Sequence, residues 1–161
     1  MQRVIVRDAI AGDLRRVREI YAEEAEHGIA TFDALGRPRG FWQNQLVADD
    51  PFLVAASGDR VHGYANASVY RPRAAYDRTR EVSVYLAGDA RGQGIGRALY
   101  AELLERLRES ATHTALAVIA LPNDASVRLH ESFGFTEAGT LREVGRKFDR
   151  WIDTARFQLM L

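Results

Sequence analysis

"VSVYLAGDARGQGIGRALYAELLERL", Val82–Leu107, joins an apolar strand to an amphipathic helix through a loop with three alternate glycines. A strand that runs through a glycine loop into a helix presents free backbone N–H groups at the positive end of the helix dipole. Phosphate is the natural ligand of this arrangement. Because Gly92, Gly94 and Gly96 carry no side chain, they allow a ligand to approach the backbone closely.

The spacing within the loop excludes two phosphate-binding designs. A dinucleotide loop requires Gly-x-Gly-x-x-Gly, and Arg97 stands where its third glycine belongs. A Walker loop ends in Gly-Lys-Ser/Thr, and the only lysine of the chain is the distant Lys147. The stretch from Arg91 to Gly96 fits a third pattern, Arg/Gln-x-x-Gly-x-Gly/Ala. A tight turn that packs the helix on the strand remains the alternative.

Composition narrows the possible functions of the chain. Its 161 residues suit one domain, and 22 basic and 22 acidic residues give a formal charge of zero, so broad attraction to nucleic acid or an acidic membrane is not expected. The absence of cysteine excludes disulfides, thiolate metal sites and cysteine nucleophiles, and the four histidines show no metal-binding spacing. These two observations predict a protein without a metal. The charged N-terminus and the lack of a long apolar run predict that it is cytoplasmic.

Hydrophobic periodicity predicts strands and helices in mixed order. Strand patterns cover residues 3–9, 51–57, 61–71, 80–87, 114–121 and two segments within 138–161, of which 114–121 reads as buried on both faces. Helical patterns cover 14–28 with Asp13 as the cap, 41–50, a helix from Ile95, and part of 122–135. This order predicts an α/β or α+β domain with a mixed central β-sheet flanked by helices, parallel in its middle strand–helix–strand part.

Two stretches downstream of the loop carry a family resemblance. They read "AVIALPNDASVRLHESFGF" (117–135) and "GRKFDRWIDTARFQL" (145–159). Together with the loop they resemble the GCN5-related N-acetyltransferase (GNAT) superfamily, in its phosphinothricin acetyltransferase branch. The resemblance spans nearly the whole chain and implies one GNAT domain over residues 1–161.

The resemblance also implies an activity. A member of this branch moves the acetyl group of acetyl-CoA to the primary amine of a small amino-acid-like acceptor, such as phosphinothricin, methionine sulfoximine or methionine sulfone. The amine attacks directly, and the enzyme is a homodimer. Two alternatives are kept. One is an acetyltransferase for a different amine (a protein N-terminus, a polyamine or an aminoglycoside), and the other is a non-catalytic acetyl-CoA-binding module.

By the same resemblance, the loop binds the pyrophosphate of coenzyme A and the strand before it pairs with the pantetheine arm. Asn123 is expected to bind the pantetheine or position its helix, with helix capping as the alternative. The predicted cofactor-binding residues are Val84, Tyr85, Leu86, Arg91, Gly92, Gln93, Gly94, Ile95, Gly96, Asn123 and Ser126.

Two residues are the predicted catalytic groups. Glu81 matches the glutamate that acts as general base in the branch, and its alternative is an exposed glutamate beside Arg80. His130 stands where most of the superfamily has a tyrosine that donates a proton to the leaving thiolate, and imidazole can do this near neutral pH. The alternative for His130 is a histidine packed on the inner face of its helix.

The acceptor side is predicted from two pairs of residues. Arg71 and Arg73 match a basic pair in the branch, and their guanidinium groups suit an amino-acid carboxylate, although loop arginines are commonly only solvated. Thr31 and Phe32 match a Thr-Phe segment that lines the acceptor pocket, with the protein core as the alternative for Phe32.

Overall fold

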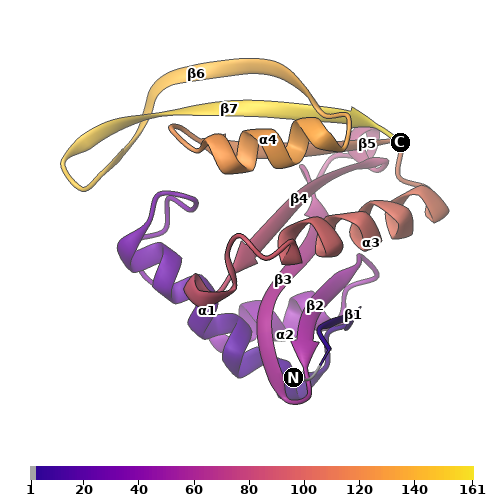
Figure 1. Ribbon diagram of the computed structural model, residues 1–161. Helices are drawn as coiled ribbons and strands as arrows, with labels where there is room; N and C mark the ends of the chain where they lie inside the picture. The colour runs from indigo at the N-terminus through magenta and orange to yellow at the C-terminus, as the bar shows by residue number, and fades with distance from the viewer. Residues whose placement is uncertain (1–2) are drawn as a thin grey trace.

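A single mixed β-sheet runs through the computed structural model, which describes residues 3–161 (Figure 1). Its strand order is β1-β2-β3-β4-β5-β7-β6, and every neighbouring pair is antiparallel except β4 and β5. The mixed sheet predicted from the sequence is therefore confirmed, with its parallel pair in the expected place. The strands are β1 (Ile5–Asp8), β2 (Phe52–Ser57), β3 (Arg60–Val69), β4 (Thr79–Leu86), β5 (Thr114–Ala120), β6 (Thr136–Lys147) and β7 (Arg150–Met160).

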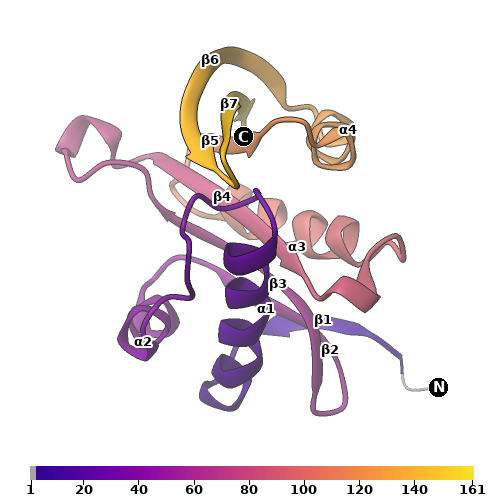
Figure 2. The ribbon, with the colours of Figure 1, turned by 90° about the vertical axis from the view of Figure 1, so that its left-hand side faces the viewer.

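Helices cover both faces of the sheet, with α2 and α3 on opposite sides (Figure 2). The ring of Tyr21 in α1 packs edge-on against Tyr85 of β4, while Gly96 in α3 faces Leu86, the next residue along β4. Because successive residues of a strand point to opposite faces, α1 and α3 lie on opposite faces of β4. The helices are α1 (Leu14–His27), α2 (Arg39–Val47), α3 (Ile95–Glu109) and α4 (Asp124–Ser132).

The two parallel strands part after a short ladder. Residues Thr79–Glu81 of β4 pair with Thr114–Leu116 of β5, and beyond them the pairing ends although both strands continue. Antiparallel partners hold each strand on its other side, β3 beside β4 and β7 beside β5. The sheet is therefore split open between Leu86 and Ala120.

Three details differ from the sequence-based expectations. The carboxylate of Asp13 does not cap α1; it accepts hydrogen bonds from the Ile10 N–H and the Arg7 guanidinium, and so closes the turn before the helix. Helix α2 covers 39–47 rather than 41–50, because Pro38 already has the backbone angles of a helix cap. Strand β5 is not buried on both faces, since Val118 lies where β4 has moved away and is partly exposed.

The core lies between the sheet and its helices. Leu99, Leu103, Leu104 and Leu107 of α3 are fully buried, as the four-residue spacing predicts for most of them. No helix in the described part of the chain is long and apolar enough to cross a membrane.

The burial of α3 predicts how the fold responds to truncation. Leu103→Ala removes a side chain that is 0% exposed and should lower the free energy of unfolding by about 2–5 kcal/mol. Leu35→Ala is the matched control, because Leu35 is 69% exposed and its loss should change stability by less than about 0.5 kcal/mol. Urea unfolding of both variants measures the difference, and equal losses would contradict this account of the core.

Candidate active site

A cavity of about 480 Å³ fills the opening between β4 and β5. The N-terminal end of α3 and the helix α4 close it on the side of the sheet that α3 covers. Its lining combines backbone of β4 and β5 with the glycine loop, and includes Val82, Ser83, Val84, Tyr85, Leu86, Arg91, Gly92, Gly94, Ile95, Gly96, Ala117, Val118, Ile119, Asn123, Ser126, Leu129 and His130.

The glycine loop has the backbone of an anion-binding turn. Gly92 and Gly94 have φ angles of +72° and +78°, in the left-handed region where other L-residues are strained. A Cβ atom on either glycine would meet no atom within 4 Å, so the backbone angle and not crowding requires glycine. Gly94 also caps α3 without any side-chain hydrogen bond, which leaves the first N–H groups of the helix available to a ligand.

The edge of β4 provides a second kind of contact. Beyond Glu81 no strand of the described chain pairs with the side of β4 that faces β5. The outward N–H and C=O groups of residues 82–86 can therefore accept an extended ligand as though it were an added strand. Together the split sheet and the loop fit a long molecule with a strand-like arm and a phosphate end.

Most of the predicted cofactor residues line this cavity. Gln93 is the exception, because its side-chain amide donates to the Asp89 carbonyl and it is absent from the lining. Arg91 lines the cavity and also donates to Glu24 of α1, 3.0 Å away. Asn123 caps α4 by accepting from the Ser126 N–H at 3.2 Å, which confirms the capping alternative. Direct contact of these residues with coenzyme A stays a prediction.

His130 is a buried and fully hydrogen-bonded imidazole. Its Nδ1 lies 2.7 Å from the Ser126 carbonyl oxygen, which can only accept, so Nδ1 carries the hydrogen. The Tyr100 hydroxyl therefore donates to Nε2, at 2.8 Å. Burial lowers the pKa of His130 and keeps the ring neutral. Its role as proton donor stays a prediction, and Tyr100 is the group that holds a proton against Nε2.

A second cavity, of about 350 Å³, lies on the opposite face of β4 under α1 and α2. Its floor is a polar grid, in which paired residues of β3 and β4 stand side by side on one face. The three pairs are Tyr64 with Tyr85, Asn66 with Ser83, and Ser68 with Glu81.

Glu81 occupies one end of this grid. Its carboxylate is half-buried and has no hydrogen-bond partner or ion pair within residues 3–161. Burial raises the pKa of Glu81, and the charges of Arg156 and Arg37 oppose the rise. The alternative prediction, that Glu81 is an exposed glutamate beside Arg80, is wrong. Glu81 lines the cavity, and Arg80 pairs with Asp50 at 2.6 Å.

The predicted acceptor residues divide into two groups. Thr31 and Phe32 line the second cavity, and Phe32 is 45% exposed, so it is not a core residue. Arg71 and Arg73 are exposed and line neither cavity; the Arg71 guanidinium instead lies 5.3 Å from the centre of the Tyr70 ring. The binding role of these two arginines stays a prediction.

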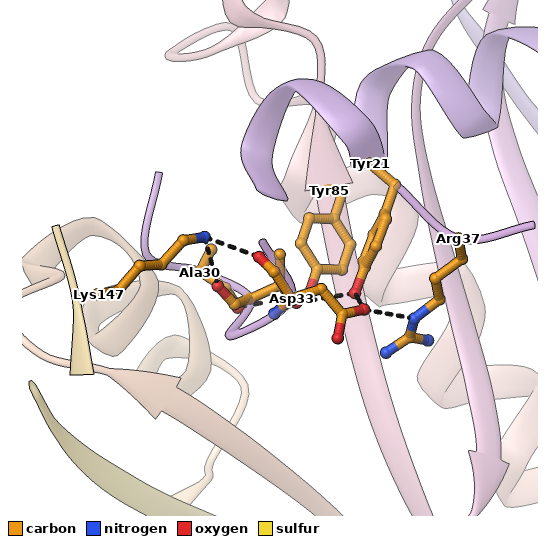
Figure 3. Close-up of polar contacts among 7 residues, drawn as sticks. Tyr21, Ala30, Asp33, Arg37, Tyr85 and Lys147 are labelled. Atoms are coloured by element: carbon orange, nitrogen blue, oxygen red, sulfur yellow. Dashed lines mark hydrogen bonds and ion pairs between the residues drawn. The ribbon is translucent and has the colours of Figure 1, made fainter. Parts of the chain in front are cut away.

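A hydrogen-bond network holds the loop that carries Thr31 over the second cavity (Figure 3). The Tyr21 hydroxyl contacts the Asp33 carboxylate and, at 2.7 Å, the Thr31 hydroxyl. Arg37 Nε donates to Asp33 at 2.7 Å, and Lys147 Nζ donates to the Thr31 and Asp33 carbonyls. Burial and the nearby Asp33 raise the pKa of Tyr21 to about 12, so its hydroxyl stays protonated.

Sequence reasoning missed several residues of this cavity. The alternation of Tyr64, Asn66 and Ser68 in β3 matches that of Glu81, Ser83 and Tyr85 in β4, and would have placed them together once the pairing was known. No sequence pattern marked Arg37 or Trp42, which come from a loop and from α2.

The two cavities meet across β4. Residues on both linings are Ala30, Val82, Ser83, Tyr85 and Val118. A ligand on the split edge of the sheet can therefore contact a second ligand that lies on the polar grid. Within residues 3–161 no group of three or more His, Asp or Glu side chains is arranged to hold a metal ion.

Comparison with known proteins identifies the relatives of the chain. Residues 14–135 match the model of the acetyltransferase (GNAT) family. A phosphinothricin N-acetyltransferase of Streptomyces coelicolor is 39% identical over 96% of this chain and 95% of its own length. An L-methionine sulfoximine/L-methionine sulfone acetyltransferase of Pseudomonas aeruginosa is 34% identical over 97% of this chain and 94% of its own.

Solved structures show the same architecture. A phosphinothricin acetyltransferase of Sinorhizobium meliloti, in complex with acetyl-CoA, superposes with a TM-score of 0.93 at 37% identity, covering 98% of this chain and 88% of that one. A ribosomal-protein-alanine N-acetyltransferase of Brucella melitensis superposes with a TM-score of 0.93 at 38% identity, covering 98% and 99%.

The neutral, buried state of His130 predicts a pH dependence of stability. Since the pKa of His130 is lowered in the folded state, the unfolded chain binds its proton first as pH falls below about 6.5. Folding stability should fall between pH 7 and 5, by up to about 1.4 kcal/mol per pH unit from this group. His130→Gln should flatten the slope in urea unfolding at each pH, and a variant with the wild-type slope would contradict the assignment.

Proposed function

The chain belongs to the acetyltransferase (GNAT) family, and on this premise we propose that it transfers the acetyl group of acetyl-CoA to the primary amine of a small amino-acid-like acceptor. The proposed acceptors are of the phosphinothricin, methionine sulfoximine and methionine sulfone type, which the names of the two curated relatives support. The observation that carries the proposal is the meeting of the two cavities at Val82, Ser83 and Tyr85.

The first cavity fits acetyl-CoA. The loop from Arg91 to Gly96 offers backbone N–H groups to the pyrophosphate, and residues Val84–Leu86 offer a free strand edge to the pantetheine arm. Bound acetyl-CoA supplies a thioester whose carbonyl carbon is attacked by the amine. A backbone N–H of the β4 edge polarises a carbonyl held there, because the strand fixes the direction of the N–H in advance.

Glu81 is the proposed general base. An amine attacks only when it has lost its ammonium proton, so a carboxylate must lie near the nitrogen. Glu81 lines the second cavity, which we propose holds the acceptor and call the acceptor cavity. Its carboxylate has no hydrogen-bond or ion-pair partner among the described residues. Burial raises its pKa and so makes it a better proton acceptor than an exposed glutamate.

Two further roles are proposed for residues beside the chemistry. His130 gives its Nδ1 proton to the leaving thiolate while Nε2 takes the proton of the Tyr100 hydroxyl, 2.8 Å away, and Tyr100 then regains a proton from solvent. Arg71 and Arg73 bind the acceptor carboxylate. Because both arginines lie outside the two cavities that meet at β4, this second role requires a partner subunit or a closing movement to bring them to the substrate.

A ribosomal-protein-alanine N-acetyltransferase of similar structure favours a second candidate acceptor, a protein N-terminus. Thiol release from acetyl-CoA, measured with methionine sulfone, phosphinothricin, an alanine-terminated peptide, a polyamine and an aminoglycoside, separates the candidates. The proposal expects the two amino-acid analogues to be acetylated with the highest kcat/KM. Tight acetyl-CoA binding with no transfer to any acceptor would instead indicate a binding module.

We further propose that the enzyme acts in the cytoplasm, where disulfides are rare and a chain without cysteine forgoes no stabilising crosslink.

We also propose that the enzyme is a homodimer. Strand β6 forms an edge of the sheet, and its hairpin with β7 exposes apolar side chains at Leu141, Val144, Phe148 and Trp151. Apolar groups on an exposed strand edge favour association. Sedimentation equilibrium should give twice the 18.0 kDa chain mass, and a mass of 18.0 kDa at micromolar concentration would contradict the dimer.

Removing the proposed base should give a pH-dependent defect. We expect Glu81→Gln to lower kcat at pH 7 by about 10²-fold or more, with an unchanged KM for acetyl-CoA, because the amine then keeps its proton. The defect should shrink at high pH, where solvent removes that proton. In the wild type, the rise of kcat/KM with pH should begin above the usual range of a glutamate, because the pKa of Glu81 is raised.

Glu131→Gln is the matched control for this experiment. Glu131 is exposed on α4 and lines neither cavity, so its loss should leave kcat within about twofold of the wild type. A Glu81→Gln enzyme with wild-type activity from pH 6 to 9 would remove Glu81 as the base.

A further inference from the structure

Two buried hydrogen-bond donors of the acceptor cavity have no partner. Trp42 is 2% exposed and Tyr64 is 1% exposed, yet neither the indole Nε1 nor the phenol oxygen makes a hydrogen bond. Both residues line the cavity, Trp42 from α2 and Tyr64 from the polar grid on β3. A buried polar group without a partner costs about 1–3 kcal/mol, and such groups in native proteins are normally bonded to an ordered water, an ion or a ligand.

Arg37 brings a positive charge to the same cavity. Its Nε is engaged by Asp33, and its guanidinium lies over the rings of Tyr21 and Phe41, 4.8 and 4.4 Å from their centres. These contacts fix the orientation of the group. The two terminal nitrogens carry no dashed line to a partner in Figure 3, and no hydrogen bond within the described chain uses them.

We infer that Arg37, Trp42 and Tyr64 form a site for oxygen atoms of the acceptor side chain, with Tyr64 at the end of the polar grid opposite Glu81. This inference rests on the proposed function. A guanidinium and an indole N–H can only donate hydrogen bonds, so the group between them must offer acceptor oxygens. Sulfone, sulfoximine and phosphinate groups present such oxygens, and a plain thioether does not.

The position of the site along the grid favours side-chain oxygens over the carboxylate of the acceptor. Tyr64 and Ser68, which pairs with Glu81, are four residues apart in β3, a separation of about 13 Å between their Cα atoms. The amine and carboxylate of an amino acid are attached to the same carbon. With the amine at Glu81, oxygens at the end of the side chain can reach farther along the grid towards Tyr64 than the carboxylate oxygens can.

The proposed site explains how the enzyme would select oxidised side chains. An acceptor with oxygens satisfies the three donors, whereas one with a hydrocarbon or thioether end leaves them buried and unpaired. Sites that hydrogen-bond a substrate group reject the analogue that lacks it much more strongly than apolar pockets reject a missing methylene. Methionine sulfone should therefore be a better acceptor than methionine itself.

The test compares Tyr64→Phe with the wild type on three acceptors: methionine sulfone, methionine, and the carboxamide of methionine sulfone. We expect kcat/KM for methionine sulfone and for its carboxamide to fall about tenfold in the variant, with kcat/KM for methionine unchanged. The melting temperature should stay equal or rise, because the change removes a hydroxyl that is unpaired in the free protein. A purely structural role of the hydroxyl would lower the melting temperature and affect all three acceptors alike.

Arg37 gives an independent arm of the experiment. Arg37→Met should raise the KM for methionine sulfone about tenfold without changing the KM for acetyl-CoA, and Arg37→Lys should restore part of the loss because it keeps the charge. Arg39→Met is the matched control, since Arg39 is exposed and lines neither cavity.

The outcomes separate the inference from the function on which it rests. A wild-type enzyme that acetylates none of the three acceptors overturns both. If the wild-type enzyme acetylates them but the variants lose kcat/KM equally on methionine and on methionine sulfone, the proposed site is overturned and the proposed function stands. If the variants lose kcat/KM on methionine sulfone and on methionine but not on the carboxamide, the three donors bind the carboxylate of the acceptor. This result overturns the assignment to side-chain oxygens.

Discussion

The divergence of β4 from β5 after Glu81 and Leu116 is the constraint on which the site depends. A continuous ladder would satisfy the backbone of both strands and leave no opening in the sheet. Once the strands part, residues Val82–Leu86 keep a row of N–H and C=O groups without a strand partner. These groups need a ligand or water, and the glycine loop at the end of the same strand offers a phosphate site in line with them.

The same strand also lies between the two cavities, and its side-chain alternation gives each face its own lining. Leu86 faces α3, while Glu81, Ser83 and Tyr85 face the cavity under α1 and α2. The backbone edge therefore lines the first cavity, and one row of side chains lines the second. A shift of one residue along β4 would turn Glu81 away from the second cavity, so the register of this ladder decides which side chains line that cavity.

The sequence predicted the local parts of this arrangement and missed those that depend on contacts across the fold. The strand, loop and helix of Val82–Leu107 follow from glycine spacing and periodicity, and capping of α4 by Asn123 was kept as the alternative to pantetheine binding. Asp13 was assigned the wrong partner, because Arg7 reaches it from β1. Arg37 and Trp42 reach the cavity through α2 and its preceding loop, whose path over β3 no local pattern encodes.

Hydrogen-bond satisfaction distinguishes two kinds of buried polar group in this protein. His130 is buried with a partner on each ring nitrogen, so its environment holds it in one neutral tautomer and explains it without any ligand. Glu81, Trp42 and Tyr64 are buried to different degrees without partners among the described residues, and folding gains nothing from leaving them so. All three line the acceptor cavity. A substrate with an amine at Glu81 and side-chain oxygens at Trp42 and Tyr64 would satisfy all three.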